Sequence, residues 1–529
     1  MTLTVEAAAD APAHGDRSTD RVTLIDLPPG GIGALGVPAP LRPWRDRDEL
    51  TGWVITAIIT ALAAATRFWN LGGPQNKVFD EVYYATEAQE ILRYGYENNP
   101  GYIFVVHPSV GKWLIAFGSA VFGDNPTGWR VAPALAGTLS VFLIVRIARR
   151  MFRSNLLGGI AGALLTMDGL SLVQSRVALL DIFLQLFVLA AFGALVVDRD
   201  HFRARLAQFL ADGGDARDQL PALGPRPWRL VGGVLLGLAS GVKWSAAWFV
   251  VAFVLMSLLW DRGALKSAGA RHPWAAALRR SWLGAIGSLF LAPLVTYVAT
   301  WLGWWAGENS INRHWADSHP GHGIAGSLPN WLRSLWNYHA EAYHFHTTLT
   351  SPHPYQSTPW SWLVLGRPVL YAYTQTPDGQ SGASDCGSSK CVREILLLGT
   401  PLMWWAFLPV LVWLLWHWVT TRDWRAGAVL LAFIAGWGAW VKYTERTMFL
   451  FYMTPLMPFL VLGLTLALGV LLGPSRRPSL RMLWYRPNWR VLAVAVYLGA
   501  VVADFVWMFP IFTNFPISLS SWRAHMWFQ

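Results

Sequence analysis

Charged side chains are scarce in this sequence of 529 residues. Asp, Glu, Lys and Arg make up 14% of it, against about 25% in ordinary soluble proteins. Hydrophobic residues make up 54%, and 32 residues are tryptophan. The composition therefore excludes a soluble globular protein and predicts an all-α polytopic membrane protein.

Cysteine and a leader-like apolar core are also lacking. The two cysteines, Cys386 and Cys391, are too few to complete the tetrahedral shell of a structural zinc site. Residues 1–50 hold no apolar run long enough for a cleavable signal, and their Pro, Gly and Asp/Arg pairs predict a disordered cytoplasmic tail. We expect residues 51–529 to form one transmembrane catalytic domain.

Apolar runs dominate the rest of the chain, and a helix needs about 20 residues to span the hydrocarbon core. The clear runs are 52–68, 130–147, 177–197, 282–302, 401–419, 426–441, 448–472 and 490–509. Two further runs, 155–172 and 229–260, are interrupted by glycine or charge, and we interpret the second as two helices that turn at Gly241–Trp244. The sequence therefore predicts about eleven transmembrane helices, with further helices in the external loops.

Basic residues indicate the orientation, because short connections rich in Lys and Arg stay on the cytoplasmic side. Alternate connections hold more than half of the 42 Lys and Arg residues, and the other side has much longer loops. This distribution predicts a cytoplasmic N-terminus, an external C-terminus, and external loops at 70–128 and 303–394. The net charge of +11 then reflects topology, and no nucleic-acid partner is expected.

Both cysteines fall in the second of these loops. A C-x4-C pair in an oxidising compartment favours a disulfide over a metal site. We therefore predict a small disulfide between Cys386 and Cys391.

The loop 70–128 carries the first candidate site. Asp80 and Glu81 follow the first apolar run, so we expect them just outside the bilayer, with His107, Lys112 and Arg130 after them in the chain. A carboxylate base beside fixed cations suits attack on a lipid-phosphate-linked group, because the base deprotonates an acceptor and the cations stabilise the departing phosphate. The alternative is that the two acids pair with Arg or Lys only to seat an interfacial helix, and the pattern alone leaves both interpretations open.

Further charges lie where other predicted helices reach the external face. Arg176 and Asp181 begin one predicted span, Lys243 lies at a helical turn, and Arg446 lies in the turn K-Y-T-E-R. Ionisable groups at the membrane are costly and are functional candidates by default. Interfacial snorkelling is the alternative for several of them, and it suits Lys442 better.

Histidines concentrate in the loop 303–394. His339 and His346 are two helical turns apart and would share a helix face, so a metal site is conceivable. The loop lacks an H-x3-H pair or a complete ligand set. We therefore favour a substrate cleft with a polar lining, in which Trp and Tyr stack on a sugar.

Seven stretches, spread over nearly the whole membrane region, match one family's pattern in its order. They are F-D-E-V-Y-Y-A (79–85), H-P-S-V-G-K (107–112), G-W-R-V-A-P-A-L-A-G (128–137), R-V-A-L-L-D (176–181), H-T-T-L-T-S-P-H-P-Y-Q-S-T-P-W-S-W (346–362), L-L-L-G-T-P-L-M-W-W (396–405) and R-T-M-F-L-F-Y-M-T-P-L-M-P-F (446–459). Together they resemble the protein O-mannosyltransferases, and within them the actinobacterial, mycobacterial-type enzymes.

The resemblance implies a C-type glycosyltransferase (GT-C) fold and transfer of mannose from polyprenyl-phosphate-mannose to Ser or Thr of proteins that cross the membrane. It implies that Asp80 is the catalytic acid residue, which we expect to act as general base, with Glu81 beside it in the catalytic pair. Taken together with the analysis of the residues, the candidate donor- and phosphate-binding residues are His107, Lys112, Arg130, Lys243 and Arg446. The candidate substrate-cleft residues are Asp181, Arg176, His346 and His353.

The sequence departs from the eukaryotic members of this family in two ways. Its loop 303–394 is too short for their soluble β-trefoil insertion, and it has Ser109 and Val110 where H-P-P-L-G-K is commoner. The second difference makes the local packing around this motif harder to infer, but it leaves the expected roles of the motif's other residues unchanged.

Two other functions fit parts of the pattern. A lipid- or glycan-directed polyprenyl-phosphate sugar transferase would share the fold and differ in its acceptor, and the D-E pair with H-P-Y-Q-S favours a protein acceptor. A membrane transporter would show paired inverted repeats with helices broken at mid-membrane, whereas the polar clusters here gather on one face.

The expected partners are polyprenyl-phosphate-mannose, secreted proteins or peptides that contain Ser or Thr, and the lipid bilayer. The protein translocation machinery is a further candidate partner. The pattern requires no cofactor and predicts no metal ligands, although a requirement for a divalent cation stays open. The expected location is the cell membrane, with the active site on the external face.

Overall fold

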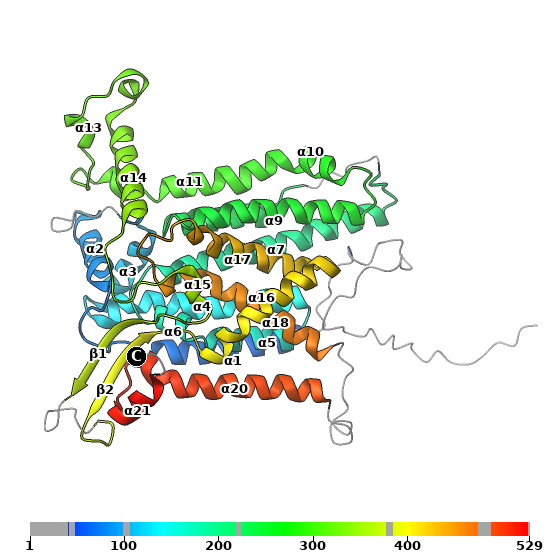
Figure 1. The fold of residues 1–529 in the computed structure, drawn as a ribbon. Helices are drawn as coiled ribbons and strands as arrows, with labels where there is room; N and C mark the ends of the chain where they lie inside the picture. The colour runs from blue at the N-terminus through cyan, green and yellow to red at the C-terminus, as the bar shows by residue number, and fades with distance from the viewer. Residues whose placement is uncertain are drawn as a thin grey trace, which may run out of the picture.

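The computed structural model describes residues 41, 48–98, 106–217, 224–376, 385–473 and 488–526. Within these ranges, nine helices are long and apolar enough to cross a membrane, and Figure 1 shows them running alongside one another as one bundle. They are α1 (Glu49–Phe68), α4 (Pro126–Phe152), α7 (Asp181–Ala211), α9 (Ala246–Ser267), the run Trp282–Ala299, α16 (Pro401–Thr421), α17 (Trp424–Val441), the run Leu450–Leu472 and α20 (Trp489–Phe512). The chain is a multi-pass membrane protein, as its composition predicts.

Two of the nine spans contain a change of helix type. Trp282–Ala299 joins the end of α10 (Pro273–Ile286) to α11 (Ala292–Ala299) through a π-helical turn, Gly287–Leu291. Leu450–Leu472 consists of a 3-10 helix, η4 (Leu450–Leu456), followed by α18 (Met457–Leu472).

The two interrupted apolar runs, 229–260 and 155–172, form different structures. The predicted turn at Gly241–Trp244 is confirmed, because α8 (Pro227–Ser240) ends just before it and α9 begins just after it. The run 155–172 is not one span: it divides into α5 (Asn155–Thr166) and α6 (Gly169–Gln174), since the Asp168 carboxylate accepts a hydrogen bond from the Ser171 amide and starts a new helix. With the shorter α5 and α8, the nine long spans match the predicted positions. The predicted tail, 1–50, lies almost entirely outside the described residues.

The connecting elements gather at one end of the bundle, where Figure 1 shows α2, α14 and the strands together. Helix α14 runs across the direction of the membrane helices. The elements are α2 (Glu81–Tyr94), α3 (Val110–Phe122), α12 (Leu302–Ala306), α13 (Trp315–Ser318), the 3-10 turn Gly323–Ser327, α14 (Asn330–Thr348), α15 (Pro359–Trp362) and α21 (Leu519–His525).

A small antiparallel sheet lies among these elements, so the all-α prediction missed one feature. The strands β1 (Val369–Thr376), β2 (Cys391–Leu397) and β3 (Ile517–Ser518) pair in the order β1-β2-β3. Val369 pairs with Leu397 at one end of the hairpin, and Thr376 pairs with Cys391 at the other. Cys386 and Cys391 form the predicted disulfide, with their Cα atoms 5.8 Å apart.

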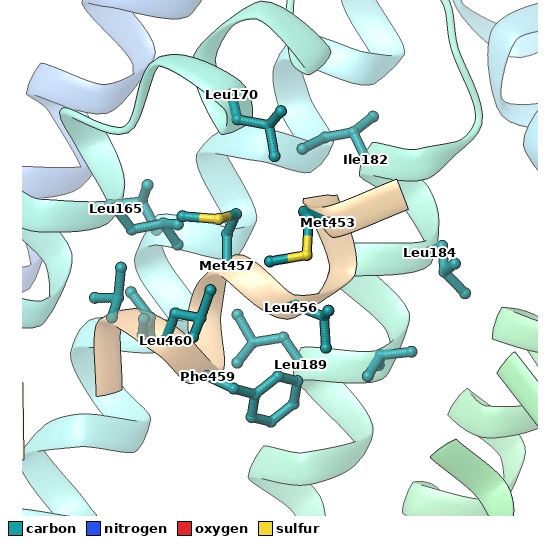
Figure 2. Close-up of a cluster of buried hydrophobic side chains, with 14 of the residues drawn as sticks. Leu165, Leu170, Ile182, Leu184, Leu189, Met453, Leu456, Met457, Phe459 and Leu460 are labelled. Carbon is teal, nitrogen blue, oxygen red and sulfur yellow. The ribbon is translucent and has the colours of Figure 1, made fainter. Parts of the chain in front are cut away.

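The buried core fixes the ends of the helices that carry the site. Figure 2 shows Leu170 of α6, Ile182 of α7, Met453 of η4 and Met457 of α18 packed against one another. Within a membrane, close packing and not removal of apolar surface from water holds helices together. This cluster therefore holds the start of α7 against η4 and α18.

Candidate active site

Asp80 occupies the residue before α2, in a tight turn. The Glu81 amide donates to the Val78 carbonyl (3.0 Å), and the Tyr84 amide donates to the Asp80 carbonyl (3.1 Å), which starts the helix. The Asp80 side chain forms no cap hydrogen bond with α2. Its half-buried carboxylate is therefore not used to stabilise the helix that it precedes.

A buried ion pair faces Asp80. The Lys243 ammonium, from the turn between α8 and α9, donates to the Asp181 carboxylate at the start of α7 (2.7 Å). Burial raises the pKa of Asp80 to about 6, the nearby charge of Lys243 opposes this rise, and the Asp181 carboxylate adds to it. Asp80 is thus ionised at neutral pH and basic enough to accept a proton.

Two histidines and an arginine lie beside this ion pair. The rings of His107 and His346 stack with centroids 4.9 Å apart. His346 Nε2 lies 2.6 Å from the Val106 carbonyl oxygen and donates to it, so its Nδ1 accepts from Arg446 (3.5 Å). Arg446 also donates to the Tyr452 hydroxyl (3.2 Å). Arg446 Nε and His107 Nδ1 are buried without a hydrogen-bond partner among the described residues.

Both histidines are neutral at neutral pH. Burial lowers the pKa of His346 to about 4, although its bond to the Val106 carbonyl opposes the shift. Burial lowers the pKa of His107 well below its usual value, and the charge of Lys243 lowers it further. Arg446 is therefore a cation whose hydrogen bonds in the described part of the chain go to neutral groups.

The structure thus brings together many of the residues that the sequence singled out. The group is Asp80, His107, Asp181, Lys243, His346 and Arg446. His353 lies at its edge, with its ring 5.9 Å from that of Phe79 and 5.0 Å from that of Phe449.

Glu81 and Arg130 lie apart from this group and face each other. Arg130 binds the Glu81 carboxylate through two bonds (2.8 and 2.7 Å), and the remaining bonds of Glu81 come from the amides of Val78 and Ala178. The other Arg130 donors go to backbone carbonyls of the segment 71–76. Both side chains are fully buried. This arrangement argues against the predicted phosphate contact of Arg130 and against direct catalysis by Glu81.

Lys112 is also committed to carboxylates within the protein. Its ammonium lies 2.7 Å from Glu97 and 3.1 Å from Glu87, and it is 1% exposed. Burial raises the pKa of Glu87 to about 7, while the charge of Lys112 opposes that shift. The geometry argues against the predicted phosphate contact here as well, because two carboxylates already surround the ammonium.

Arg176 caps a helix instead of lining a cleft. Its guanidinium donates to the carbonyls of Thr66, Arg67 and Trp69, at the end of α1. These carbonyls lack partners within the helix, and an arginine at a helix C-terminus also suits the helix dipole. Arg176 is 4% exposed, which argues against its predicted contact with substrate.

Sequence reasoning missed two aromatic residues next to Asp80. Phe79 carries no ionisable group, and Tyr371 lies on the unpredicted strand β1. The two rings stack with centroids 4.8 Å apart, and the Tyr371 hydroxyl accepts from Gln174 (2.9 Å). The β-branched and aromatic residues of V-L-Y-A-Y-T-Q-T, bounded by Pro368 and Pro377, were a signal for the strand.

The residues of the site do not suit a divalent cation. Within the described ranges, no group of three or more His, Cys, Asp or Glu side chains could hold a metal ion. Asp181 already binds a fixed cation, Lys243. His339, the conceivable partner of His346 in a metal site, instead contacts the Tyr297 hydroxyl (2.7 Å) and the Leu335 carbonyl (2.8 Å).

Comparisons with known proteins agree over most of the chain. Residues 57–130 and 106–210 match family models described as dolichyl-phosphate-mannose-protein mannosyltransferase. Residues 331–529 match the C-terminal four TMM region of protein-O-mannosyltransferase.

Curated relatives named polyprenol-phosphate-mannose–protein mannosyltransferase match nearly the whole chain. The protein from Mycolicibacterium smegmatis is 45% identical, over 95% of this chain and 98% of the relative. The protein from Mycobacterium tuberculosis is 43% identical, over 96% of this chain and 97% of the relative.

One solved structure shows the same fold at low identity. It is the S. cerevisiae protein O-mannosyltransferase Pmt1-Pmt2 complex bound to the sugar donor, with a TM-score of 0.71, 14% identity, and coverage of 95% of this chain and 97% of that one. The architecture is that of the GT-C glycosyltransferases, as the sequence predicts.

Proposed function

The chain belongs to the protein O-mannosyltransferase family and is a glycosyltransferase, and from that premise we propose that it transfers mannose from polyprenyl-phosphate-mannose to Ser and Thr hydroxyls of secreted or translocating proteins. Asp80 is the observation that carries this proposal. Its carboxylate is held beside a buried ion pair, is not used by α2, and has a pKa of about 6 because of burial. These are the properties of a general base at neutral pH.

The proposed reaction is a single displacement. Asp80 takes the hydroxyl proton as the Ser or Thr oxygen attacks the anomeric carbon of mannose. The bond from that carbon to the phosphate oxygen breaks, and its electron pair leaves with polyprenyl phosphate. The anomeric configuration is inverted, and the proton remains on Asp80. A positioned base contributes about 10²–10⁴ in rate.

Arg446 is the cation we assign to the leaving phosphate. Its described hydrogen bonds go to neutral groups, and its Nε is without a described partner. Lys243, in contrast, is neutralised by Asp181, so we assign it to holding that carboxylate and tuning Asp80. A fixed cation at the leaving oxygen stabilises the charge that develops there. His107, neutral and with an unused ring nitrogen, is assigned to a hydroxyl group of the sugar.

We place this site on the external side of the cell membrane. The support is the excess of Lys and Arg in the connections that would lie on the cytoplasmic side, together with the gathering of the site at the opposite end of the bundle. The isoprenoid tail of the donor would then lie between helices, and acceptor proteins would arrive as they cross the membrane.

Transfer by the purified protein tests the proposed function. The protein, in lipid nanodiscs, is given polyprenyl-phosphate-[14C]mannose with either a Ser/Thr/Pro-rich peptide or the same peptide with Ala at every Ser and Thr. We expect label only on the first peptide, released by alkaline β-elimination as O-linked sugar is. Label in a lipid other than the donor, or in an added glycan, with none in the peptide would instead support a lipid- or glycan-directed transferase. In proteoliposomes, whose bilayer separates two compartments, movement of intact donor across the bilayer without transfer would support a transporter.

A further inference from the structure

Phe79, next to Asp80, has a backbone conformation that its residue type rarely adopts. Its φ is +46°, in the left-handed region where the Cβ of a bulky side chain crowds the backbone. The other described residues with positive φ are glycine, asparagine, arginine or leucine. Such a conformation persists only where the surroundings hold it, and it occurs often at functional sites.

An aromatic cage around the Phe79 ring stabilises this left-handed conformation. The ring stacks on Tyr371 (4.8 Å between centroids) and meets His353, Phe449 and Phe451 edge-on, each at 5.9 Å. Stacked and edge-to-face pairs are the favoured geometries of aromatic contacts. The partners come from β1, from the segment after α14, from η4 and from the residue before η4. Parts of the chain that are distant in sequence therefore meet on one ring.

A second anchor fixes the other side of Asp80. Glu81 accepts from the Val78 amide (2.9 Å) and the Ala178 amide (2.9 Å) and is bound twice by Arg130. Asp80 thus lies between a caged ring at Phe79 and a fully bonded carboxylate at Glu81. With both neighbours fixed, the direction in which the Asp80 side chain leaves the backbone is fixed too.

We propose that Phe79 is a positioning residue, whose caged ring holds the left-handed turn that directs the Asp80 carboxylate at the acceptor hydroxyl. This inference rests on the proposed role of Asp80 as base. It assigns Phe79 no contact with the substrate, so its loss should affect turnover more than donor binding. Misplacement of a catalytic group by about 1 Å costs about 10²-fold in rate.

The test compares four variants in the peptide assay with polyprenyl-phosphate-mannose. Phe79→Ala removes the ring, Phe79→Gly also relieves the backbone strain, and Phe79→Tyr keeps the ring. Phe142→Ala is the control for lost packing, because Phe142 contacts Trp53 in the α1–α4 pair and none of the cage. We expect Phe79→Ala and Phe79→Gly to lower kcat by about 10- to 100-fold with the donor KM within about threefold of wild type. Phe79→Tyr should restore most of kcat, and Phe142→Ala should leave kcat unchanged.

The pH dependence of the rate distinguishes positioning of Asp80 from a purely structural role, because a purely structural role would leave it unchanged. A loosened Asp80 gains water, so the pH at which the rate of Phe79→Ala falls to half should be lower than in wild type. If Phe79→Ala fails to fold, Tyr371→Ala against Tyr371→Phe tests the same stack, with the second expected to retain kcat.

Wild-type kcat in Phe79→Ala, or parallel losses of kcat and donor affinity that Phe79→Tyr does not restore, would overturn the inference. Asp80→Asn, measured alongside, separates this failure from failure of the proposed function. An inactive Asp80→Asn with a fully active Phe79→Ala removes only the role of Phe79. An active Asp80→Asn removes the role of the base itself.

Discussion

At the scale of single residues, the site combines one half-buried base with charges that are already paired. Asp181 and Lys243 neutralise each other (2.7 Å), and the two histidines are uncharged at neutral pH. Asp80 and Arg446 are then the groups whose charge is left for the reaction. A carboxylate base and a cation suit a reaction in which the base takes up a proton from the attacking group and negative charge develops on the leaving group.

The pKa of Asp80 predicts how activity depends on pH. Burial raises this pKa to about 6, and the base acts only when it is deprotonated. Activity should therefore be full above that value and be lost as the pH falls through it. Initial rates at saturating peptide between about pH 5 and about pH 8, with donor binding measured at each pH, check this. A rate that stays constant down to about pH 4.5 would mean that a carboxylate of ordinary pKa, or none, is the base.

Arg446→Ala should weaken donor binding while leaving the fold intact. Arg446 is half-buried, and its described bonds go to a tyrosine hydroxyl and a histidine nitrogen. A lost hydrogen bond to a charged phosphate corresponds to about 1.5–3 kcal/mol, or about 10- to 100-fold in affinity. Direct binding of polyprenyl-phosphate-mannose to the purified variant measures this. Unchanged affinity and unchanged kcat would remove Arg446 from the site.

Arg130→Ala should show the opposite pattern. Its removal leaves the Glu81 carboxylate buried without its cation, and breaking a buried pair costs about 3–5 kcal/mol. We expect a large fall in thermal midpoint and in the yield of monodisperse protein, whereas Arg446→Ala serves as the stable control. A fully stable Arg130→Ala that has lost only donor affinity would restore the phosphate contact that the sequence predicts.

The sequence could identify these charged residues but not the direction each one faces. Arg130 meets an acid 49 positions away, and Arg176 meets the carbonyls of a helix more than 100 positions away. In the linear sequence, a cation that faces a ligand and a cation that faces an internal carboxylate look the same. Only the packing of α1, α2 and α4 separates the two cases. Asp80 and Glu81 are adjacent in the sequence, yet in the structure their side chains have different partners.

At the scale of elements, hydropathy predicts the long helices well. In the hydrocarbon core the backbone N–H and C=O groups can form hydrogen bonds only within the helix, so a long apolar run that spans the membrane must be helical. The turn at Gly241–Trp244 was also predictable, since a lysine interrupts an apolar run. The break between α5 and α6 was not, because it depends on the Asp168 carboxylate, which also accepts from the Trp404 indole (2.8 Å) of a distant helix. Strand β1 is not predicted, because it is a strand only through its pairing with β2, which the local sequence does not show.

The hairpin of β1 and β2 gives a prediction about the disulfide. Cys386 and Cys391 close a short ring next to β2, and a ring of this size stabilises by no more than about 2–3 kcal/mol. Replacing both by Ser should lower the thermal midpoint modestly and leave mannosyl transfer nearly unchanged. Loss of all transfer at an unchanged thermal midpoint would instead tie the bond to the chemistry.

At the scale of the whole molecule, α7, α8 and α9 are linked by ion pairs at both ends. Lys243 and Asp181 join them at the end that holds the site. At the opposite end, Arg226 binds both Asp198 of α7 and Asp261 of α9. Buried ion pairs add little net stability, but removing one partner of such a pair is costly. The three helices therefore present the Asp181–Lys243 pair to Asp80 from a frame that is held at both ends.

The orientation of this frame in the membrane is testable by cysteine labelling. The two native cysteines are joined in a disulfide. A maleimide, which reacts with free thiols, therefore labels a newly introduced cysteine. A cysteine at exposed Ser327 should react with an impermeant maleimide in intact cells, and one at exposed Asp215 should react only after lysis. Equal labelling of both positions in intact cells would contradict the external active site.

The most direct test of the central claim is the turnover of Asp80→Asn. Asn keeps the size and much of the hydrogen-bonding capacity of Asp but cannot take up a proton, so the change removes the base and little else. The purified variant is assayed for transfer from polyprenyl-phosphate-mannose to the Ser/Thr/Pro-rich peptide, with donor binding measured on the same sample. We predict a loss of at least about 10²-fold in kcat with donor affinity largely retained. An Asp80→Asn protein that keeps more than about a tenth of wild-type turnover would contradict the assignment of Asp80 as the base.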